Sequence, residues 1–343
     1  MSFVSKSAAL GAAALMFAAF MPGQGFAADD PIEFRISLET GPNHSRNKSI
    51  EKFVQALNEK TSGRLKAEIY HGGALFKGRD IPKALAQGTI DMSAPGTWQL
   101  STFVPDADLT ALPAFYGLDR ERVYEIVDGP IGQELNQRIE EKLKVKVLGG
   151  WLDLGYVHTY STGKKVESFE DMKGLKVRFP GGTVNSERYK HFGANTVLIP
   201  WPDVPLALIQ GTVDGVQTSN ESIRSAKLWE SGLKYGFEDK QVLFQYVPVV
   251  SGRFWNKLDD ELQQVILDTW QESIGEMRDY AHERQEEARA EAVENGMEFV
   301  TPSAEALAEA RQGLLSTQDA IIEELKMDPD LAKRATEALA SAS

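Results

Sequence analysis

Residues 174–215 read GLKVRFPGGTVNSERYKHFGANTVLIPWPDVPLALIQGTVDG, and this stretch indicates both the fold and a binding site. A short apolar run ends near Arg178 and is followed by Pro-Gly-Gly at residues 180–182. Two glycines in a row let a backbone approach another group closely. An arginine at a strand end can hold a carboxylate through its planar fork of N–H donors. The alternative is a structural arginine that pairs with an acidic neighbour such as Asp203.

Strands and helices are predicted to alternate along the chain. The expected strands are residues 32–38, 65–70, 89–93, 145–148 and 213–217, and the expected helices are residues 49–62, 81–87, 184–192 and 204–210. This pattern is typical of mostly parallel sheets with helices on their faces. It predicts two α/β lobes, with chain crossings between them near residues 152–160 and 244–250.

A long helix is predicted over residues 258–295, which contain no proline and a single glycine, Gly275. Apolar residues recur there at spacings of three and four, which is the signature of one helix face. A continuous helix of that span would be roughly 55 Å long and could pack against both lobes. The alternative is a pair of helices broken near Gly275, since glycine costs about 1 kcal/mol inside a helix.

The N-terminus has the pattern of an export signal. Lys6 precedes an apolar run at residues 8–21, and the small-residue site Gly-Phe-Ala ends at residue 27. The apolar run is shorter than the ~20 residues that span a bilayer, so residues 1–27 are predicted to be a cleaved secretory signal. A flexible tail is the alternative. Because the chain has no cysteine, we expect no disulfide, thiolate site or lipid anchor, and the mature protein should be free in the compartment to which it is exported.

Charge and motifs exclude several classes of function. The net charge is -13, and loss of residues 1–27 removes Lys6 but no acidic residue, which gives -14. Such a surface disfavours nucleic acid and anionic membranes. The common catalytic and phosphate-binding motifs are missing from the sequence. We therefore expect a protein that is not an enzyme, with no metal, no cofactor, no nucleic-acid partner and no direct membrane insertion.

At this point the chain resembles a known family, the DctP-type substrate-binding proteins of TRAP transporters. The motifs that carry the resemblance are KTSGRL at 60–65, QGTIDM at 87–92, GLKVRFP at 174–180, FGA at 192–194, IPW at 199–201, ALIQGTVDG at 207–215 and FWNKL at 254–258. The resemblance implies a two-lobed periplasmic binding protein (type II-like) with mixed sheets flanked by helices and a long helix that spans both lobes. The expected boundaries are 28–154 plus 245–280 for lobe I and 155–244 plus 281–343 for lobe II.

The resemblance also implies a function and an anchor for the ligand. Members of the family close on a small organic anion, usually a carboxylate, and deliver it to an ion-driven membrane permease. Arg178 falls on the family's carboxylate-binding arginine, and Trp201 falls where an aromatic ring often lies against the ligand. Thr218 falls where many members have asparagine. A hydroxyl there keeps one donor and loses the second donor of the amide.

Further ligand contacts are expected at strand ends and at the crossings. Trp98 and Glu39, the latter with His44, follow strands at positions where ligands collect in open α/β sheets. Many relatives have a second arginine near residues 156–158, where this chain has Tyr156 and His158. His158 could replace it as a largely neutral hydrogen-bond donor. The complete set of expected contacts is Arg178, Trp201, Thr218, His158, Trp98, Gln245, Glu39 and Tyr156.

With one fixed cation in the site, the sequence favours a monocarboxylate such as a sugar acid, hydroxy acid or oxo acid. A sulfonate, or a zwitterion countered by Glu39, is the alternative. Three other functions share some of these features: the receptor of an ABC importer, an exported hydrolase or lyase acting on a small acid, and a sensory receptor. The long helix favours the TRAP receptor over the first of them.

Overall fold

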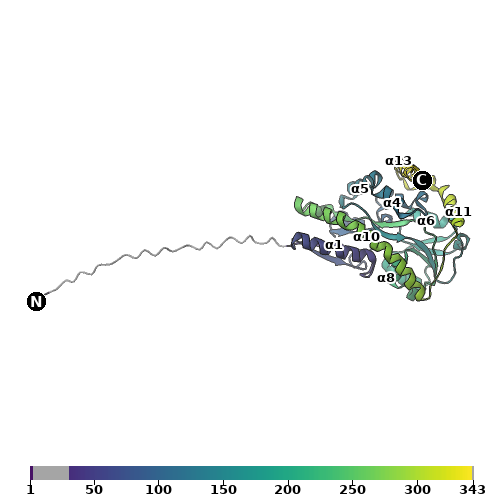
Figure 1. Ribbon diagram of the computed structural model, residues 1–343, viewed down its shortest axis with the longest axis horizontal. Helices are drawn as coiled ribbons and strands as arrows, with labels where there is room; N and C mark the ends of the chain where they lie inside the picture. Colours follow the sequence, from purple (N-terminus) through teal and green to yellow (C-terminus); the bar gives the residue numbers. More distant parts are fainter. Residues whose placement is uncertain (3–30, 342–343) are drawn as a thin grey trace. The chain divides into compact units, whose positions relative to one another are not determined.

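The computed structural model describes residues 1–2 and 31–341, so the predicted signal at residues 1–27 lies almost entirely outside the described part of the chain. From Pro31 onward the chain forms one compact unit. Two mixed β-sheets organise this unit (Figure 1). The expected α/β architecture with mixed sheets is therefore confirmed.

The first sheet has five strands in the order β2-β1-β3-β12-β4. Their bounds are β1 Ile32–Ser37, β2 Leu65–Tyr70, β3 Met92–Ser93, β4 Val145–Val147 and β12 Val249–Ser251. β1 runs parallel to β2 and β3, whereas β12 is antiparallel to both of its neighbours. The β1–β2 register pairs Ile36 with Ile69 and brings the ends of the two strands together.

The second sheet has six strands in the order β13-β10-β6-β9-β7-β8. Their bounds are β6 His158–Ser161, β7 Lys176–Phe179, β8 Asn195–Leu198, β9 Gly215–Thr218, β10 Tyr235–Phe237 and β13 Glu298–Val300. β7 is parallel to β8 and β9, and β6 is antiparallel to β9 and β10. In this register Arg178 lies opposite Val197 on one side and Val216 on the other.

A two-stranded ribbon joins the two sheets. Its strands are β5 (Leu152–Tyr156) and β11 (Leu243–Tyr246), which pair antiparallel. The chain leaves the first sheet after β4 and enters the second through β5, then returns from β10 to β12 through β11. Both passages fall within the segments where the sequence predicts crossings.

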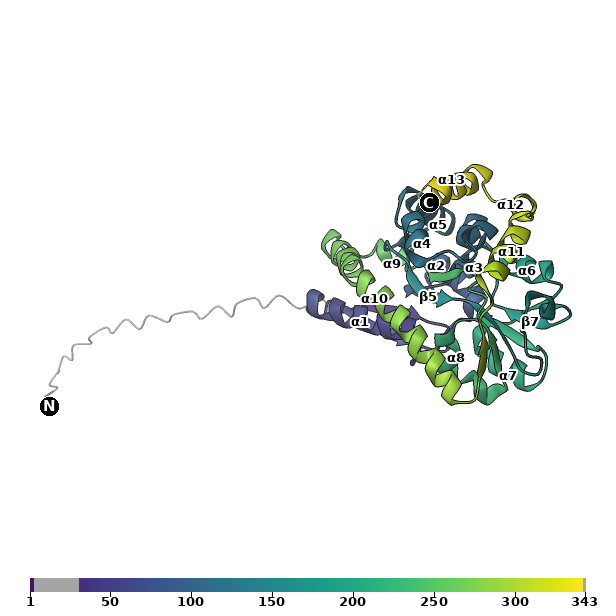
Figure 2. The ribbon, with the colours of Figure 1, turned by 45° about the vertical axis from the view of Figure 1, so that its right-hand side comes forward.

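Helices cover the sheets (Figure 2). Their bounds are α1 Ser45–Thr61, α2 Ile81–Gln87, α3 Thr97–Leu100, α4 Arg120–Val127, α5 Pro130–Leu143, α6 Thr183–His191, α7 Val204–Ile209, α8 Asn220–Ala226, α9 Gly252–Trp255, α10 Asp260–Glu294, α11 Ala304–Leu315, α12 Gln318–Leu325 and α13 Pro329–Ser341. The 3-10 turns include η2 (Pro105–Ala111) and η5 (Trp201–Asp203). No helix among residues 31–341 is both long and apolar enough to cross a membrane.

The long helix α10 is continuous over 35 residues. It begins at Asp259, whose side chain accepts a hydrogen bond from the backbone of Leu262, and this capping contact satisfies one of the free N–H groups of the first turn. At 1.5 Å per residue the helix is about 50 Å long. It packs against α1 near the first sheet and against α8 near the second (Figure 2). The predicted spanning helix is confirmed, and the alternative break at Gly275 is wrong.

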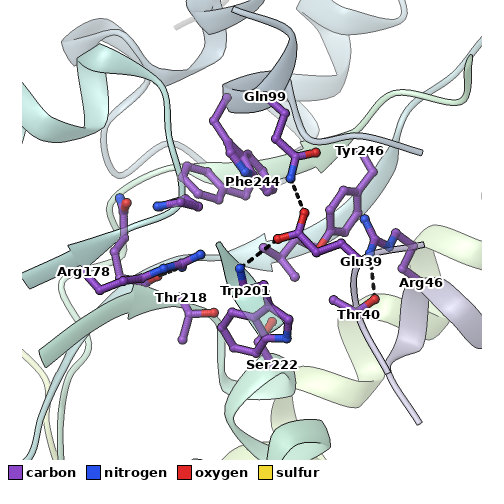
Figure 3. Close-up of a pocket in the computed structure, with 14 residues that line it drawn as sticks. Glu39, Thr40, Arg46, Gln99, Arg178, Trp201, Thr218, Ser222, Phe244 and Tyr246 are labelled. Carbon is purple, nitrogen blue, oxygen red and sulfur yellow. Dashed lines mark hydrogen bonds between the residues drawn. The ribbon is translucent and has the colours of Figure 1, made fainter. Parts of the chain in front are cut away.

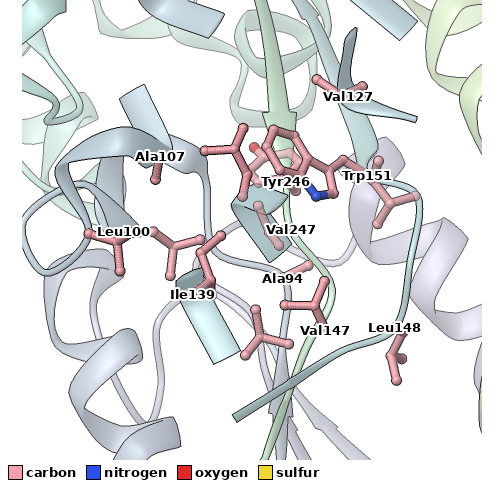
Figure 4. Packing of buried hydrophobic residues seen from close by; sticks show 14 of the residues in the cluster. Ala94, Leu100, Ala107, Val127, Ile139, Val147, Leu148, Trp151, Tyr246 and Val247 are labelled. Atoms are coloured by element: carbon pink, nitrogen blue, oxygen red, sulfur yellow. The ribbon is translucent and has the colours of Figure 1, made fainter. Parts of the chain in front are cut away.

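The largest apolar core lies at the first sheet and includes Trp151, Val147 and Val247 (Figure 4). Smaller cores lie at the second sheet. Buried residues of α12 and α13 belong to the large core, and α13 contacts α4 and α5. α12 also contacts α6, which lies beside the second sheet. The predicted lobe boundaries, which assign residues 281–343 to the second lobe, stay predictions.

Candidate ligand cavity

A cavity lies where elements of the two sheets meet (Figure 3). It is lined by Glu39, Thr40, Arg46, Trp98, Gln99, Leu154, Arg178, Pro180, Trp201, Gln217, Thr218, Ser222, Phe244 and Tyr246. Five of the eight predicted contacts are among them: Arg178, Trp201, Thr218, Trp98 and Glu39.

Arg178 on β7 is held by backbone oxygens rather than by an acidic side chain. Its Nε donates to the carbonyl of Ile199 at 2.8 Å, and its Nη1 donates to the carbonyl of Gln217 at 3.3 Å. The side chain is only 2% exposed, and burial lowers the pKa of the guanidinium to about 10. No carboxylate within the described part of the chain forms an ion pair with it. The guanidinium is therefore a buried cation without an ion-paired carboxylate among the described residues, although the charge of Glu39 acts on it and partly offsets the lowering of its pKa.

The alternative partner of Arg178, Asp203, is engaged elsewhere. Its two carboxylate oxygens each accept from Nζ of Lys77 at 2.7 Å. Lys77 precedes the short η1 turn (Gly78–Asp80) beside the first sheet, and Asp203 ends η5 beside the second. The structural pairing of Arg178 with Asp203 is thus wrong, and this exposed ion pair instead links the two sides of the cavity region.

Aromatic side chains form one wall of the cavity. The rings of Trp98 and Phe244 stack with centroids 4.4 Å apart, and Trp98 lies 5.5 Å from Tyr246. Across the cavity, Trp201 has its ring 5.5 Å from the guanidinium carbon of Arg178. The indole Nε1 of Trp98 is buried without a hydrogen-bond partner among the described residues. An apolar wall of this kind excludes water and strengthens any ion pair formed inside.

Glu39, in the loop after β1, joins the two sides of the cavity (Figure 3). One carboxylate oxygen accepts from the backbone N–H of Trp201 at 3.0 Å. The other accepts from the side-chain amide of Gln99. Glu39 therefore tethers η5 of the second sheet to the first, in addition to lining the cavity.

Three predicted contacts lie outside this cavity. Gln245 is not among the lining residues, although its neighbours Phe244 and Tyr246 are, and its amide donates to Asp153 at 3.0 Å. Tyr156 donates its hydroxyl hydrogen to the carbonyl of Leu118 at 2.8 Å. The structure thus directs these two side chains elsewhere.

His158 is the third predicted contact that lies outside the cavity. Its Nδ1 accepts from the backbone N–H of Lys240 at 3.1 Å, and burial lowers the pKa of the imidazole to about 4. It lines a separate cavity beside α10, as Tyr156 also does. His158 therefore lies apart from the cavity that contains Arg178, and its role in ligand binding stays a prediction.

The sequence reasoning missed Arg46 and Tyr246. Arg46 lies in the first turn of α1, which contains no acidic residue, and its guanidinium carbon lies 4.1 Å from the centre of the Tyr246 ring. A cation in the first turn of a helix opposes the helix dipole. This unfavourable position of a cation in the sequence is the signal that could have indicated a role for Arg46 outside the helix. The cavity therefore contains two arginines, rather than the single one that the sequence predicts.

The fold consists of two mixed β-sheets, flanked by helices and joined by a crossing ribbon, with a buried cation in the cavity where they meet. This arrangement is that of a solute-binding protein of the two-lobed class. Comparison with known proteins assigns the family. The model of the DctP family, described as bacterial extracellular solute-binding protein, family 7, matches residues 36–324. The chain belongs to this family. Among residues 31–341 no group of His, Asp or Glu side chains is arranged to hold a metal ion.

Relatives with printed functions are also similar to this chain. The 2,3-diketo-L-gulonate-binding periplasmic protein of Escherichia coli is 27% identical over 267 residues, covering 78% of this chain and 80% of that protein. A solute-binding protein of Verminephrobacter eiseniae is 33% identical over 193 residues, covering 56% of this chain and 57% of that relative. The chain thus aligns with little more than half of the Verminephrobacter protein.

Solved structures share the fold at low sequence identity. The sugar acid binding protein of Advenella mimigardefordensis, in complex with galactonate, has a TM-score of 0.85 at 20% identity and covers 91% of this chain and 99% of its own. A TRAP periplasmic solute binding protein of Sulfurospirillum deleyianum with bound succinate has a TM-score of 0.82 at 23% identity, covering 89% and 98%. These similarities show that this chain has the fold of the TRAP solute-binding proteins.

Proposed function

We propose that this chain is the periplasmic solute receptor of a TRAP transporter. In this proposal it binds one small organic acid in the cavity at Arg178, closes around it and delivers it to the membrane permease. Arg178 carries the proposal, because a buried guanidinium without a carboxylate partner is a site prepared for an anion. The family membership supports the same function, and the relatives named above bind a diketo sugar acid, galactonate and succinate.

The geometry of Arg178 favours a carboxylate. Its Nε and Nη1 atoms are held by carbonyl oxygens that fix the plane of the guanidinium. A planar carboxylate can accept charge-assisted bonds from donors fixed in that way, each contributing about 1.5–3 kcal/mol. The ligand would also supply the missing negative charge. We therefore assign Arg178 as the anchor, with Trp201, Thr218, Trp98 and Glu39 as neighbouring contacts.

An enzymatic function is the second candidate, because His44 and Ser222 are paired at the cavity. Nε2 of His44 lies 3.1 Å from Oγ of Ser222. However, Nδ1 of His44 accepts from the backbone N–H of Arg46 at 3.1 Å, so the ring proton resides on Nε2 and is donated to the serine. A base that activates serine must accept at that nitrogen. The pair therefore supports a structural role, and we propose that the protein is not an enzyme.

Calorimetry with purified mature protein tests the function. We expect at least one acid among uronates, aldonates, hydroxy acids, oxo acids and dicarboxylates to bind and raise the melting temperature. Arg178→Met should abolish that shift, whereas Arg64→Met, which removes the same charge at an exposed site 2.9 Å from Glu261, should keep it. Binding that is unaffected by Arg178→Met would contradict the assignment. Ligand uptake by proteoliposomes containing the permease, dependent on added receptor, tests the transport step.

A further inference from the structure

Three ionisable side chains besides Arg178 share the cavity: Glu39, Arg46 and Tyr246. Arg178 and Arg46 contribute two positive charges and Glu39 one negative charge, so the charged lining residues sum to +1. A ligand with a single negative charge would neutralise the cavity, whereas a dianion would leave an excess negative charge in a desolvated space. Buried charge without compensation is strongly disfavoured. The charge balance therefore favours a monoanion.

Tyr246 offers an unused hydrogen-bond donor. The residue is 3% exposed, and its ring packs against Arg46 on one side and Trp98 on another. Its hydroxyl makes no hydrogen bond with any residue of the described part of the chain, and burial raises the pKa of this phenol to about 12. The hydroxyl is therefore neutral at pH 7 and has a hydrogen to donate to a group in the cavity.

Arg46 is placed behind Tyr246 and has few donors left for a ligand. Its Nη1 donates to the carbonyl of Ala94 at 3.0 Å and its Nη2 to Oγ1 of Thr40 at 2.7 Å. Its Nε is buried without a partner among the described residues. A guanidinium covered by a ring and held in this way acts through its charge, which lowers the pKa of the Tyr246 hydroxyl and makes it a stronger donor. Arg46 is thus a positioning residue.

Glu39 has acceptor capacity left after its contacts with the protein. Each of its oxygens accepts one bond, from the Trp201 backbone and from the Gln99 amide, whereas a carboxylate oxygen can accept about two. Glu39 and Tyr246 both line this cavity (Figure 3), and the negative charge of Glu39 also raises the pKa of the Tyr246 hydroxyl, so one ligand can contact both groups. A ligand hydroxyl could donate to Glu39 and accept from Tyr246. A second ligand carboxylate could do only the latter and would be repelled by Glu39.

We propose that Glu39 and Tyr246 form a hydroxyl subsite that makes this receptor select hydroxy-monocarboxylates over the corresponding dicarboxylates. The inference rests on the proposed function, in which the ligand carboxylate lies at Arg178. Glu39 discriminates between the two classes of acid because its charge repels a second carboxylate. Tyr246 orients the ligand hydroxyl by donating a hydrogen bond to it. Selection of this kind combines an attractive contact for the right ligand with a repulsive one for the wrong ligand.

Matched acids that differ at one end test the inference. Galactonate and galactarate share a carbon chain and differ in a terminal hydroxymethyl or carboxylate, and gluconate and glucarate form a second pair. By calorimetry we expect wild-type protein to bind at least one monoacid tenfold or more tightly than its diacid partner. Glu39→Gln should reduce this ratio at least tenfold, because it removes the repelling charge. Tyr246→Phe should weaken the monoacid about tenfold without changing the melting temperature of the empty protein by more than about 2 °C.

The outcomes separate the two levels of the proposal. If wild-type protein binds diacids as tightly as monoacids, or if Glu39→Gln leaves the ratio unchanged while binding still depends on Arg178, the hydroxyl subsite is refuted and the receptor function stands. If no acid binds wild-type protein, or binding is indifferent to Arg178→Met, the proposed function itself fails. Because Glu39→Gln can weaken closure by loosening the contact with Trp201, the test uses the ratio of the two affinities rather than either affinity alone.

Discussion

Replacement of Arg178 by methionine should separate ligand binding from folding, because its effects on the empty protein oppose each other. Burial lowers the pKa of Arg178 from 12.5 to about 10, which corresponds to roughly 3 kcal/mol against the charged form at roughly 1.4 kcal/mol per pH unit. Methionine removes that cost. It also leaves the carbonyls of Ile199 and Gln217 without their donor, at about 1–3 kcal/mol each. The two terms nearly cancel.

The effect on ligand affinity has no such compensation. A carboxylate bound to Arg178 gains about two charge-assisted bonds, worth roughly 3–6 kcal/mol together. Their loss corresponds to a reduction in affinity of about 10² to 10⁴. Arg178→Lys should also bind weakly, because a single ammonium cannot reproduce the planar fork while keeping both carbonyl contacts.

Two measurements on the same samples check this reasoning. Differential scanning calorimetry of the empty variant should give a melting temperature within about 6 °C of wild type, and titration calorimetry should give the loss in affinity. Arg64→Met is the control for net charge. A variant that melts normally and binds within tenfold of wild type would refute the role of Arg178. A variant that fails to fold would refute the cancellation of the two terms.

Four further substitutions probe other parts of the molecule. Gly275→Ala should stabilise the protein by about 0.5–1 kcal/mol in urea titrations, because a Cβ in the middle of α10 would meet no atom within 4 Å. Gly182→Ala should destabilise the protein in the same assay, since the φ of Gly182 is +72° and a Cβ there would lie 2.8 Å from Oδ1 of Asp108. Burial raises the pKa of Asp108 to about 7, so the folded state favours the protonated acid, and the stability that this preference contributes is lost as the pH rises from about 4 to 7. Asp108→Asn should therefore gain stability relative to wild type over that interval, by up to roughly 4 kcal/mol in denaturant titrations. A stability difference between the two proteins that does not change with pH would exclude Asp108 as the cause. Lys77→Ala should lower ligand affinity by less than about fivefold at low salt and by nothing measurable in 1 M salt, because the exposed ion pair of Lys77 with Asp203 contributes about 0–1 kcal/mol and is screened by salt. A loss of affinity that persists in 1 M salt would mean that Lys77 supports binding by something other than this ion pair.

Local patterns in the sequence predict most of the elements, since the spacing of apolar residues is a local property. The helix at residues 81–87 and the strand at 65–70 have the predicted bounds. The first helix begins earlier than predicted, at Ser45, because the imidazole of His44 accepts from the backbone of Arg46 and caps it. β3 is shorter than predicted, with only Met92 and Ser93 in strand conformation. Caps and edge pairing depend on contacts that periodicity does not reveal.

The cavity could be predicted where position in the chain implies position in space. Arg178, Glu39 and Trp98 follow strands or begin the next turn, and such side chains gather at one edge of a sheet. Tyr246 and Gln245 are neighbours in one strand, so which of them faces the cavity depends on the register of β11 against β5, and a bulge falls between Phe244 and Gln245. A shift of one residue exchanges the faces of a strand. The sequence therefore led to Gln245, whereas Tyr246 lines the cavity.

The glycines after Arg178 allow a close approach, as the sequence indicates, and the groups that they approach belong to the protein itself. A Cβ at Gly181 would lie 3.0 Å from the backbone oxygen of Trp98, and one at Gly182 would contact Asp108. Both neighbours belong to elements beside the first sheet, α3 and η2. The glycines thus admit the opposite side of the cavity. Because the same short loop follows directly on the strand that holds Arg178, we expect closure and anchoring to be coupled: a substitution that keeps this loop away from Trp98 should also displace the anchor from the aromatic wall.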